Sequence, residues 1–181
     1  DQTITRREAF LTDYQDRRYA DRYRRTVDKV RDAEKPLGSE TLTEAVARSL
    51  FKLMAYKDEY EVARLHTQTG FAERLRSEFD GDFRIVHHLA PPLLPSGKDA
   101  RGRPLKRAFG PWIRTPFRLL ARMKRIRGTA FDPFGYTAER RMERQLRDDY
   151  LAGLSRIAQE LTAKNHELAV ALAEIPDDIR G

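Results

Sequence analysis

Apolar residues recur at helical spacing over most of the chain. The first such stretch covers residues 5–35, where Thr5 and Glu8 have the Thr-x-x-Glu spacing of a capping box. Pro36 and Gly38 follow it and are typical of a helix end. The pattern predicts one long first helix, with an apolar face made of Phe10, Tyr14, Ala20, Tyr23, Val27 and Val30.

A second helix is predicted from about Thr41 or Thr43 to His66, and a short third helix covers residues 71–79. Asp58 falls in the middle of the second helix's apolar face. A buried carboxylate is strongly unfavourable unless it is paired. We therefore expect Asp58 to be at least partly buried in a structural ion pair with an arginine, either Arg140 or Arg141. The other residues of this face are Ala47, Phe51, Met54, Val62 and Leu65.

Residues 83–89 alternate in the manner of a strand, and residues 105–109 are expected to return as its partner. Pro91 and Pro92 end the first strand, and a loop punctuated by glycine and proline covers residues 96–104. Together these features predict a small β-hairpin with a basic loop at about residues 82–110.

Three further helical stretches follow the hairpin. The first runs from Thr115 and Pro116 to Gly128, with its inner face at Pro116, Leu119, Leu120, Met123 and Ile126. Thr137 caps a long helix with core positions Met142, Leu146, Tyr150, Leu154, Ile157 and Leu161. The last helix holds Leu168, Leu172 and Ile175 and is expected to end at Pro176.

The predicted fold class is mostly α: residues 1–181 form a single helical domain with long antiparallel helices and a small β-hairpin insertion. We expect the apolar face of residues 142–161 to pack against that of residues 46–65. Because the sequence opens at Asp1 without a methionine, we interpret it as a domain excised from a larger, multidomain protein. No run approaches the ~18 apolar residues of a membrane span, and no cysteine is present. A cytoplasmic location without membrane contact is expected.

Positive charge is concentrated in one segment. The formal net charge is +7, yet residues 98–127 contain 11 basic side chains and one acidic one, Asp99. Such a segment attracts anionic partners, although charge runs are as often only a solvated face. Arg118, Arg122 and Arg125 form one outward stripe, and we expect this stripe to dock an acidic partner.

No complete catalytic or metal site can be assembled from the sequence. His87 and His88 are neighbours on a predicted strand and point to opposite faces, while His66 and His166 have no second ligand at i+3 or i+4. The serines lie outside the known nucleophile motifs, and no glycine-rich phosphate loop precedes a helix. We therefore predict no catalytic, cofactor-binding or metal-binding residue in this chain.

Four blocks resemble the C-terminal region of the large fused indolepyruvate ferredoxin oxidoreductases. They are LFKLMAYKDEYEVARL at 50–65, HLAPPLL at 88–94, FGPW at 109–112 and RGTAFDPFGYTAERRM at 127–142. They occur in order over most of the chain. One departure is His66, where the family leads us to expect tyrosine.

The resemblance implies a thiamine-diphosphate-dependent 2-oxoacid:ferredoxin oxidoreductase as the parent enzyme. That parent would oxidatively decarboxylate aryl 2-oxo acids to acyl-CoA, using thiamine diphosphate, Mg and 4Fe-4S clusters. None of these cofactor motifs lies in this chain, so the chain is expected to be a non-catalytic accessory or interaction domain. Its expected partners are other domains of the parent chain and ferredoxin, and the parent is expected to be a homo-oligomer.

Two alternatives remain open at this stage. The chain could be an independent basic helical nucleic-acid-binding protein, with Trp112 and Phe117 among the arginines, although no known nucleic-acid module fits. It could also be a small enzyme that uses Tyr56, Lys57 or Glu59 with Arg140. The accessory domain is the favoured reading.

Overall fold

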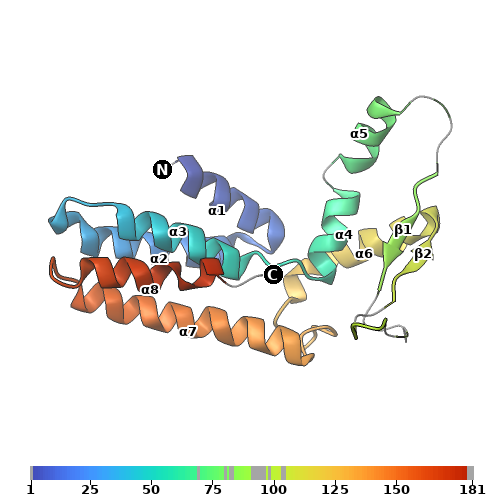
Figure 1. Ribbon diagram of the computed structural model, residues 1–181. Coiled ribbons are helices and arrows are strands. Elements are labelled where there is room, and N and C mark those ends of the chain that lie inside the picture. Colours follow the sequence, from blue (N-terminus) through green and yellow to red (C-terminus); the bar gives the residue numbers. More distant parts are fainter. Residues whose placement is uncertain are drawn as a thin grey trace. The chain divides into compact units, whose positions relative to one another are not determined.

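The fold is mostly helical with one two-stranded antiparallel hairpin, as predicted (Figure 1). The computed structural model describes residues 2–68, 70–79, 81, 84–90, 97, 99–102 and 105–178. The chain forms two compact units. Unit 1 comprises residues 1–56 and 135–181, and unit 2 comprises residues 57–134, which are inserted between the two parts of unit 1.

Unit 1 is a helical bundle. It contains α1 (Gln2–Tyr14), α2 (Arg17–Glu34), the 3₁₀ turn η1 (Lys35–Leu37), α3 (Thr41–Met54), α7 (Ala138–Glu160) and α8 (His166–Asp178). The helix α3 packs against α2, α7 and α8, and α1 packs across α2 and α3 (Figure 1). The predicted packing of residues 142–161 against the second apolar stretch is confirmed for the α3 part of that stretch. Residues 59–65 are an exception, because they belong to unit 2.

The predicted first helix is wrong in one respect: it is two helices. The break falls at Gln15 and Asp16, where Asp16 is extended and its carboxylate accepts a hydrogen bond from the Tyr19 amide at 2.8 Å. This cap begins α2 and lets α1 fold back onto it. The chain is already helical from Gln2, so Thr5 and Glu8 do not form the predicted capping box.

Tyrosine hydroxyls join α1 and α2 to α3 and to the segment that follows it. Tyr19 donates its hydroxyl to the Met54 carbonyl at 3.0 Å, and Tyr14 donates to the Tyr56 carbonyl at 3.1 Å. Tyr23 donates to the Ala47 carbonyl at 3.0 Å. The carbonyl of Met54, at the end of α3, has no intrahelical partner, so the Tyr19 hydroxyl satisfies a polar group that the core would otherwise bury unpaired.

A fully buried carboxylate fixes the other end of α3. Glu34, the last residue of α2, accepts hydrogen bonds from the amides of Leu42 and Thr43 at 2.8 Å each and from the Thr43 hydroxyl at 2.7 Å. His166 Nε2 lies 2.7 Å away at the start of α8. Burial raises the pKa of Glu34, but the hydrogen bonds from His166, Thr43 and the two amides outweigh it and lower that pKa to about 2.

Unit 2 holds the hairpin and the shorter helices. These are α4 (Glu59–Thr67), α5 (Phe71–Glu78), β1 (His87–Leu89), β2 (Arg107–Phe109), η2 (Pro111–Ile113), α6 (Arg114–Arg122) and η3 (Met123–Ile126). His87 pairs with Phe109 and Leu89 with Arg107, which confirms the predicted hairpin in a shorter form. The predicted strand residue Phe83 and the prolines at 91 and 92 lie outside the described residues. The helix α4 packs on α6 around a small core of Ala63, Phe109, Ile113, Phe117 and Ala121.

The faces predicted for three helices are partly wrong. In α6 the buried residues are Phe117 and Ala121, and Leu119 is exposed. In α7 only Leu154 is fully buried, while Met142 and Leu146 are exposed. In α8 the buried residues are Ala169, Ala173 and Pro176, and the helix continues past Pro176 to Asp178. Ala121 of α6 and Ala169 and Ala173 of α8 lie where these helices pack closely on α4 and α3, respectively.

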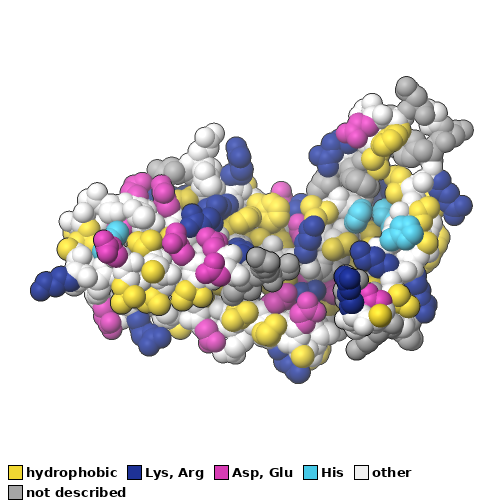
Figure 2. All heavy atoms as spheres, viewed as in Figure 1, with side chains coloured by type: hydrophobic (Ala, Val, Ile, Leu, Met, Phe, Trp, Pro, Cys, Tyr) yellow, Lys and Arg dark blue, Asp and Glu magenta, His cyan; other side chains and the backbone are white. Residues whose placement is uncertain are grey.

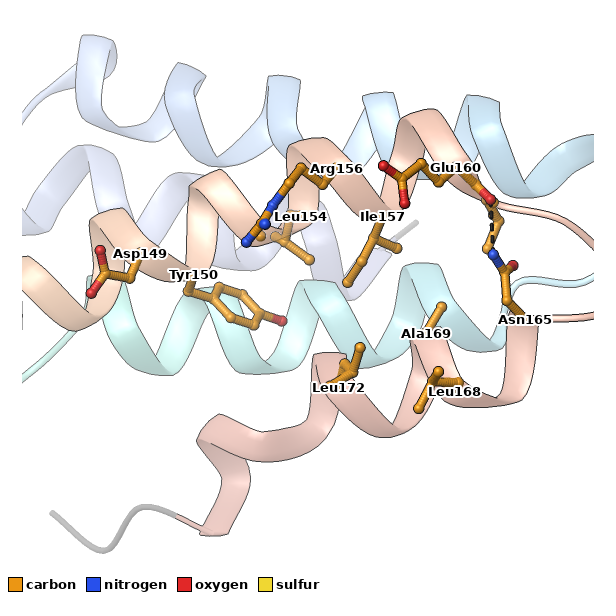
Figure 3. A pocket seen from close by; sticks show the side chains of 12 residues that line it. Asp149, Tyr150, Leu154, Arg156, Ile157, Glu160, Asn165, Leu168, Ala169 and Leu172 are labelled. Atoms are coloured by element: carbon orange, nitrogen blue, oxygen red, sulfur yellow. Dashed lines mark hydrogen bonds between the residues drawn. The ribbon is translucent and has the colours of Figure 1, made fainter.

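A groove lies between α7 and α8, and the exposed side chains of Leu168 and Leu172 line it (Figure 3). Charged and apolar side chains otherwise mix over the visible face of the protein (Figure 2). Within the described residues, none of the helices has the length and apolar character that crossing a membrane requires.

Replacing Glu34 should destabilise unit 1. Glu34→Ala leaves two buried amides and a hydroxyl without their acceptor, and we expect it to cost on the order of 3 kcal/mol in free energy of unfolding, measured by urea titration. Because its pKa is lowered on folding, Glu34 stabilises the fold above its unfolded pKa of roughly 4.3, and this contribution is lost as the pH falls towards 2. Glu34→Gln should lack this acid-dependent part. Equal acid sensitivity of both proteins would contradict the assignment.

Candidate functional site

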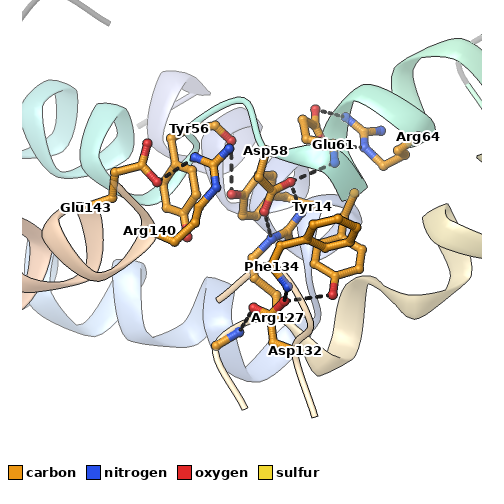
Figure 4. Close-up of polar contacts among 12 residues, drawn as sticks. Tyr14, Tyr56, Asp58, Glu61, Arg64, Arg127, Asp132, Phe134, Arg140 and Glu143 are labelled. Atoms are coloured by element: carbon orange, nitrogen blue, oxygen red, sulfur yellow. Dashed lines mark hydrogen bonds and ion pairs between the residues drawn. The ribbon is translucent and has the colours of Figure 1, made fainter. Parts of the chain in front are cut away.

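The most concentrated buried polar cluster lies in unit 2 and begins with Asp58. The predicted second helix is interrupted at residues 55–58, and Asp58 is the N-cap of α4, accepting from the Glu61 amide at 2.8 Å. Its carboxylate also forms a two-pronged ion pair with Arg127, through Nε at 2.5 Å and a terminal nitrogen at 2.9 Å (Figure 4). Both side chains are at least 96% buried, with 3% of Asp58 and 4% of Arg127 exposed. Such bidentate pairs are the strongest of the protein hydrogen bonds.

A second carboxylate, Asp132, completes the cluster. It accepts hydrogen bonds from the Tyr60 hydroxyl at 2.8 Å, the Gly128 amide at 2.7 Å and the Phe134 amide at 3.1 Å. The guanidinium of Arg127 lies 5.3 Å from the centre of the Tyr60 ring, and Phe134 meets that ring edge-on at 5.4 Å. The cluster therefore joins the start of unit 2 to its end.

The polar contacts of this cluster are suited to stabilising the fold. Burial, together with the hydrogen bond to Asp132 and its charge, raises the pKa of Tyr60, so its hydroxyl keeps its proton and acts as a donor. Asp58 accepts three hydrogen bonds and so does Asp132. Next to them on α4, Arg64 binds both carboxylate oxygens of Glu61 at 2.8 Å. Carboxylates saturated in this way hold the fold and are poorly placed to exchange protons with a substrate.

The predicted partner of Asp58 was wrong. Asp58 is buried and paired with an arginine, as predicted, but the arginine is Arg127, whereas Arg140 and Arg141 were expected. Arg140 belongs to unit 1, where it binds Glu143 at 2.6 Å and covers the ring of Tyr56 at 5.4 Å. Arg141 is exposed. The prediction failed because it placed Asp58 inside a helix, whereas the chain breaks there and turns the carboxylate towards the segment after α6.

Two histidines that the sequence analysis treated separately meet in unit 2. His66 of α4 and His87 of β1 contact each other with ring centres 4.9 Å apart, and Phe117 of α6 packs on both. Burial lowers the pKa of His66, and the nearby His87 and Lys57 lower it further. Burial also lowers the pKa of His87, with a contribution from Arg114. As predicted, His87 and His88 face opposite ways: His87 is buried and His88 exposed.

The predicted docking stripe is exposed. Arg118 and Arg122 lie on α6 and Arg125 on η3, and all three side chains face solvent. In a 3₁₀ turn residues three apart eclipse one another, so Arg125 continues the line of Arg122. Within the described part of the chain, no three His, Asp or Glu side chains gather in a way that could hold a metal ion.

Comparison with known proteins identifies the family only. The family model DUF6537, described as a family of unknown function, matches residues 1–181, and the chain belongs to this family. No curated protein and no solved structure matches the chain.

The ion pair between Asp58 and Arg127 should be essential for the stability of unit 2. Asp58→Asn keeps the N-cap but removes the charge, and Arg127→Met removes the cation. Each leaves a buried partner uncompensated, and we expect a loss of about 3–5 kcal/mol in the free energy of unfolding. Urea titration and hydrogen exchange of residues 59–67 measure it.

The control for these variants is Arg141→Ala, which should change the free energy by less than about 0.5 kcal/mol because Arg141 is exposed. The double variant Asp58→Asn/Arg127→Met should lose clearly less than the sum of the two single variants. Additive losses would show that the two residues act separately.

The histidine contact predicts an acid-sensitive unit 2. A histidine whose pKa is lowered by folding binds more protons when unfolded, so the stability of the folded state decreases as the pH falls below roughly 6.5. The cations near the two rings include Lys57, just before α4, and Arg114 of α6, so protonation adds repulsion. Hydrogen exchange of the hairpin at pH 7.5 and 5.5 measures the effect. His66→Phe/His87→Phe should flatten it, and an unchanged pH dependence would sink the interpretation.

Proposed function

We propose that this member of DUF6537 is a non-catalytic accessory and interaction domain of an indolepyruvate-type 2-oxoacid:ferredoxin oxidoreductase. The parent enzyme would oxidatively decarboxylate aryl 2-oxo acids to acyl-CoA. The assignment to this parent rests on the four blocks of residues 50–65, 88–94, 109–112 and 127–142, which resemble the C-terminal region of that enzyme family in the same order.

One observation carries the non-catalytic role. The two longest blocks, residues 50–65 and 127–142, supply Asp58 and Arg127, and their most distinctive polar residues are used to close unit 2. A block of residues can be characteristic of a family because it stabilises a domain, without any contact with a substrate. The resemblance therefore fits a structural part of the parent.

The cofactors implied for the parent do not fit this chain. Iron–sulfur clusters are held by cysteine thiolates, and the chain contains no cysteine. The buried carboxylates of unit 2 are occupied by Arg127, Tyr60 and amide donors. Thiamine diphosphate, Mg and the 4Fe-4S clusters would accordingly be bound by other parts of the parent.

The proposed interaction surface is the stripe Arg118, Arg122 and Arg125. Its partner would be an acidic protein surface, and the parent's own domains are favoured over ferredoxin because an internal contact needs no separate encounter. Among the described residues no carboxylate forms an ion pair with any of these three arginines, which leaves their charge available to a partner.

Nucleic-acid binding is the second candidate. One observation favours it. Trp112 contacts Phe109 within the basic segment of residues 98–127, and 63% of its surface is exposed. An exposed aromatic ring among arginines can stack on a base. A salt-dependent quenching of Trp112 fluorescence by single-stranded oligonucleotides would favour this candidate over protein docking.

The small-enzyme alternative has less support. Tyr56 and Arg140 lie in unit 1 and Lys57 and Glu59 in unit 2. Arg140 already binds Glu143 and covers Tyr56.

Reversing the stripe in the full-length parent tests the proposal. Arg118→Glu/Arg122→Glu/Arg125→Glu should weaken the association of this domain with the rest of the enzyme, measured by limited proteolysis and sedimentation. The matched control reverses Arg6, Arg18 and Arg25, which are exposed arginines of unit 1 and give the same change in net charge.

If ferredoxin docks at the stripe instead, assembly stays intact and ferredoxin reduction slows, more strongly at low salt. Should the stripe variant match the control in both measurements, the docking proposal is wrong. The parentage is tested separately by the coding sequence upstream of Asp1, which should encode cysteine clusters and a thiamine-binding motif.

A further inference from the structure

The groove between α7 and α8 in unit 1 is a feature that the proposed function does not use. Both helices pack on α3, and the space between them encloses about 530 Å³ (Figure 3). Its apolar lining includes Tyr150, Leu154, Ile157, Leu161, Leu168 and Leu172. The Tyr150 hydroxyl of α7 donates a hydrogen bond to the Ala173 carbonyl of α8 at 2.8 Å, which links the two helices that form the groove.

The walls of the groove continue as exposed apolar ridges. On α8 they are Leu168, Leu172 and Ile175, at i, i+4 and i+7, with 62%, 44% and 55% of their surfaces exposed. On α7 the ridge continues from the groove to Leu146 and Met142, which are also exposed. Large side chains at this spacing form the stripe by which a helix packs on another helix.

Gly153 makes a notch in this groove. It lies in the interior of α7, where glycine is the poorest helix former after proline. A Cβ atom at this position would meet nothing within 4 Å, so packing inside the protein does not require glycine there. Glycine does permit the close approach of another chain from outside.

The charges around the groove select its occupant. Beside the apolar ridge α8 carries Glu167 and Asp178, whereas Glu174 is already paired with Arg48 at 2.8 Å, and α8 contains no lysine or arginine. On α7 the groove is lined by Asp149 and Glu160 and by one cation, Arg156. Pairing two copies of the chain through this face would place the same acidic rim against itself, which disfavours self-association.

We propose that the groove binds an amphipathic helix of a partner protein whose apolar face is flanked by lysine or arginine. The ridge from Met142 to Ile157 covers about 22 Å of helix, so about four helical turns of the partner would fit. The apolar face would fill the groove over Gly153, and the basic flanks would meet the acidic rim of α8. This mode of helix-in-groove recognition is common in proteins. The proposal is independent of the arginine stripe in unit 2.

A binding experiment with synthetic peptides tests the proposal. The probe is a fluorescently labelled 18-residue helical peptide with leucines at i, i+3, i+4 and i+7 and lysines on both flanks, titrated with the 181-residue chain. The comparison peptide carries glutamate in place of lysine. We expect the lysine peptide to bind at least ten times more tightly than the glutamate peptide, and Gly153→Leu to weaken its binding at least tenfold.

Gly153→Leu should retain or increase thermal stability, because it replaces glycine within a helix where space is open. The matched control is Ala152→Leu, which introduces the same side chain on the exposed side of α7 outside the groove and should leave binding unchanged. Equal binding of the two peptides, or equal binding by the Gly153→Leu and Ala152→Leu variants, would overturn the proposal. So would a dimer in sedimentation that Gly153→Leu abolishes, since the occupant would then be a second copy. None of these outcomes bears on the arginine stripe.

Discussion

The ion pair between Asp58 and Arg127 is the constraint on which the inserted unit depends. The chain leaves unit 1 after Tyr56 and re-enters it at Gly135, so the ends of the insertion must lie close together. Asp58 and Arg127 are 69 residues apart in sequence, and Tyr60 and Asp132 are 72 apart. Closing a loop of this length costs conformational entropy, which bidentate and buried contacts can offset. Because both charged side chains are almost fully buried, removing either one leaves the other as an unpaired charge in an apolar environment.

Most of the secondary structure followed from the sequence, because apolar spacing and proline or glycine punctuation are local signals. The hairpin, the short helix after Gly70 and the long helix after Thr137 were all predicted. The sequence analysis missed the two helix breaks, although the helix after each break begins with an aspartate N-cap. The signal was present, since Asp58 precedes Glu61 at the spacing of a cap. An aspartate on an apolar stripe has two explanations, a buried pair or a helix start, and here both are true.

The identity of long-range partners could not be predicted. Arg127 belongs to a segment with 11 basic residues, and nothing local distinguishes it from Arg125 or Arg122. The contacts of Glu34 with His166 and of His66 with His87 join residues that only the tertiary fold brings together. The predicted buried faces of the helices were partly wrong for a related reason. Periodicity favours the largest apolar residues as the core, whereas α8 packs through Ala169 and Ala173 and leaves Leu168 and Leu172 outside.

The burial of alanine and exposure of leucine on α8 are informative about function. A helix that buries alanine and exposes leucine loses hydrophobic stabilisation as a free domain, at about 25 cal/mol per Å² of apolar surface left in water. The arrangement is reasonable when the exposed leucines are covered by something outside the domain. The same argument does not apply to the arginine stripe, because exposed arginines cost the free domain little. The two proposed surfaces thus differ in physical kind. The apolar groove with its acidic rim suits a contact that buries surface, while the basic stripe suits one governed by charge and salt. A partner that complements one surface would be repelled or poorly matched by the other, so the domain is suited to contact two different surfaces.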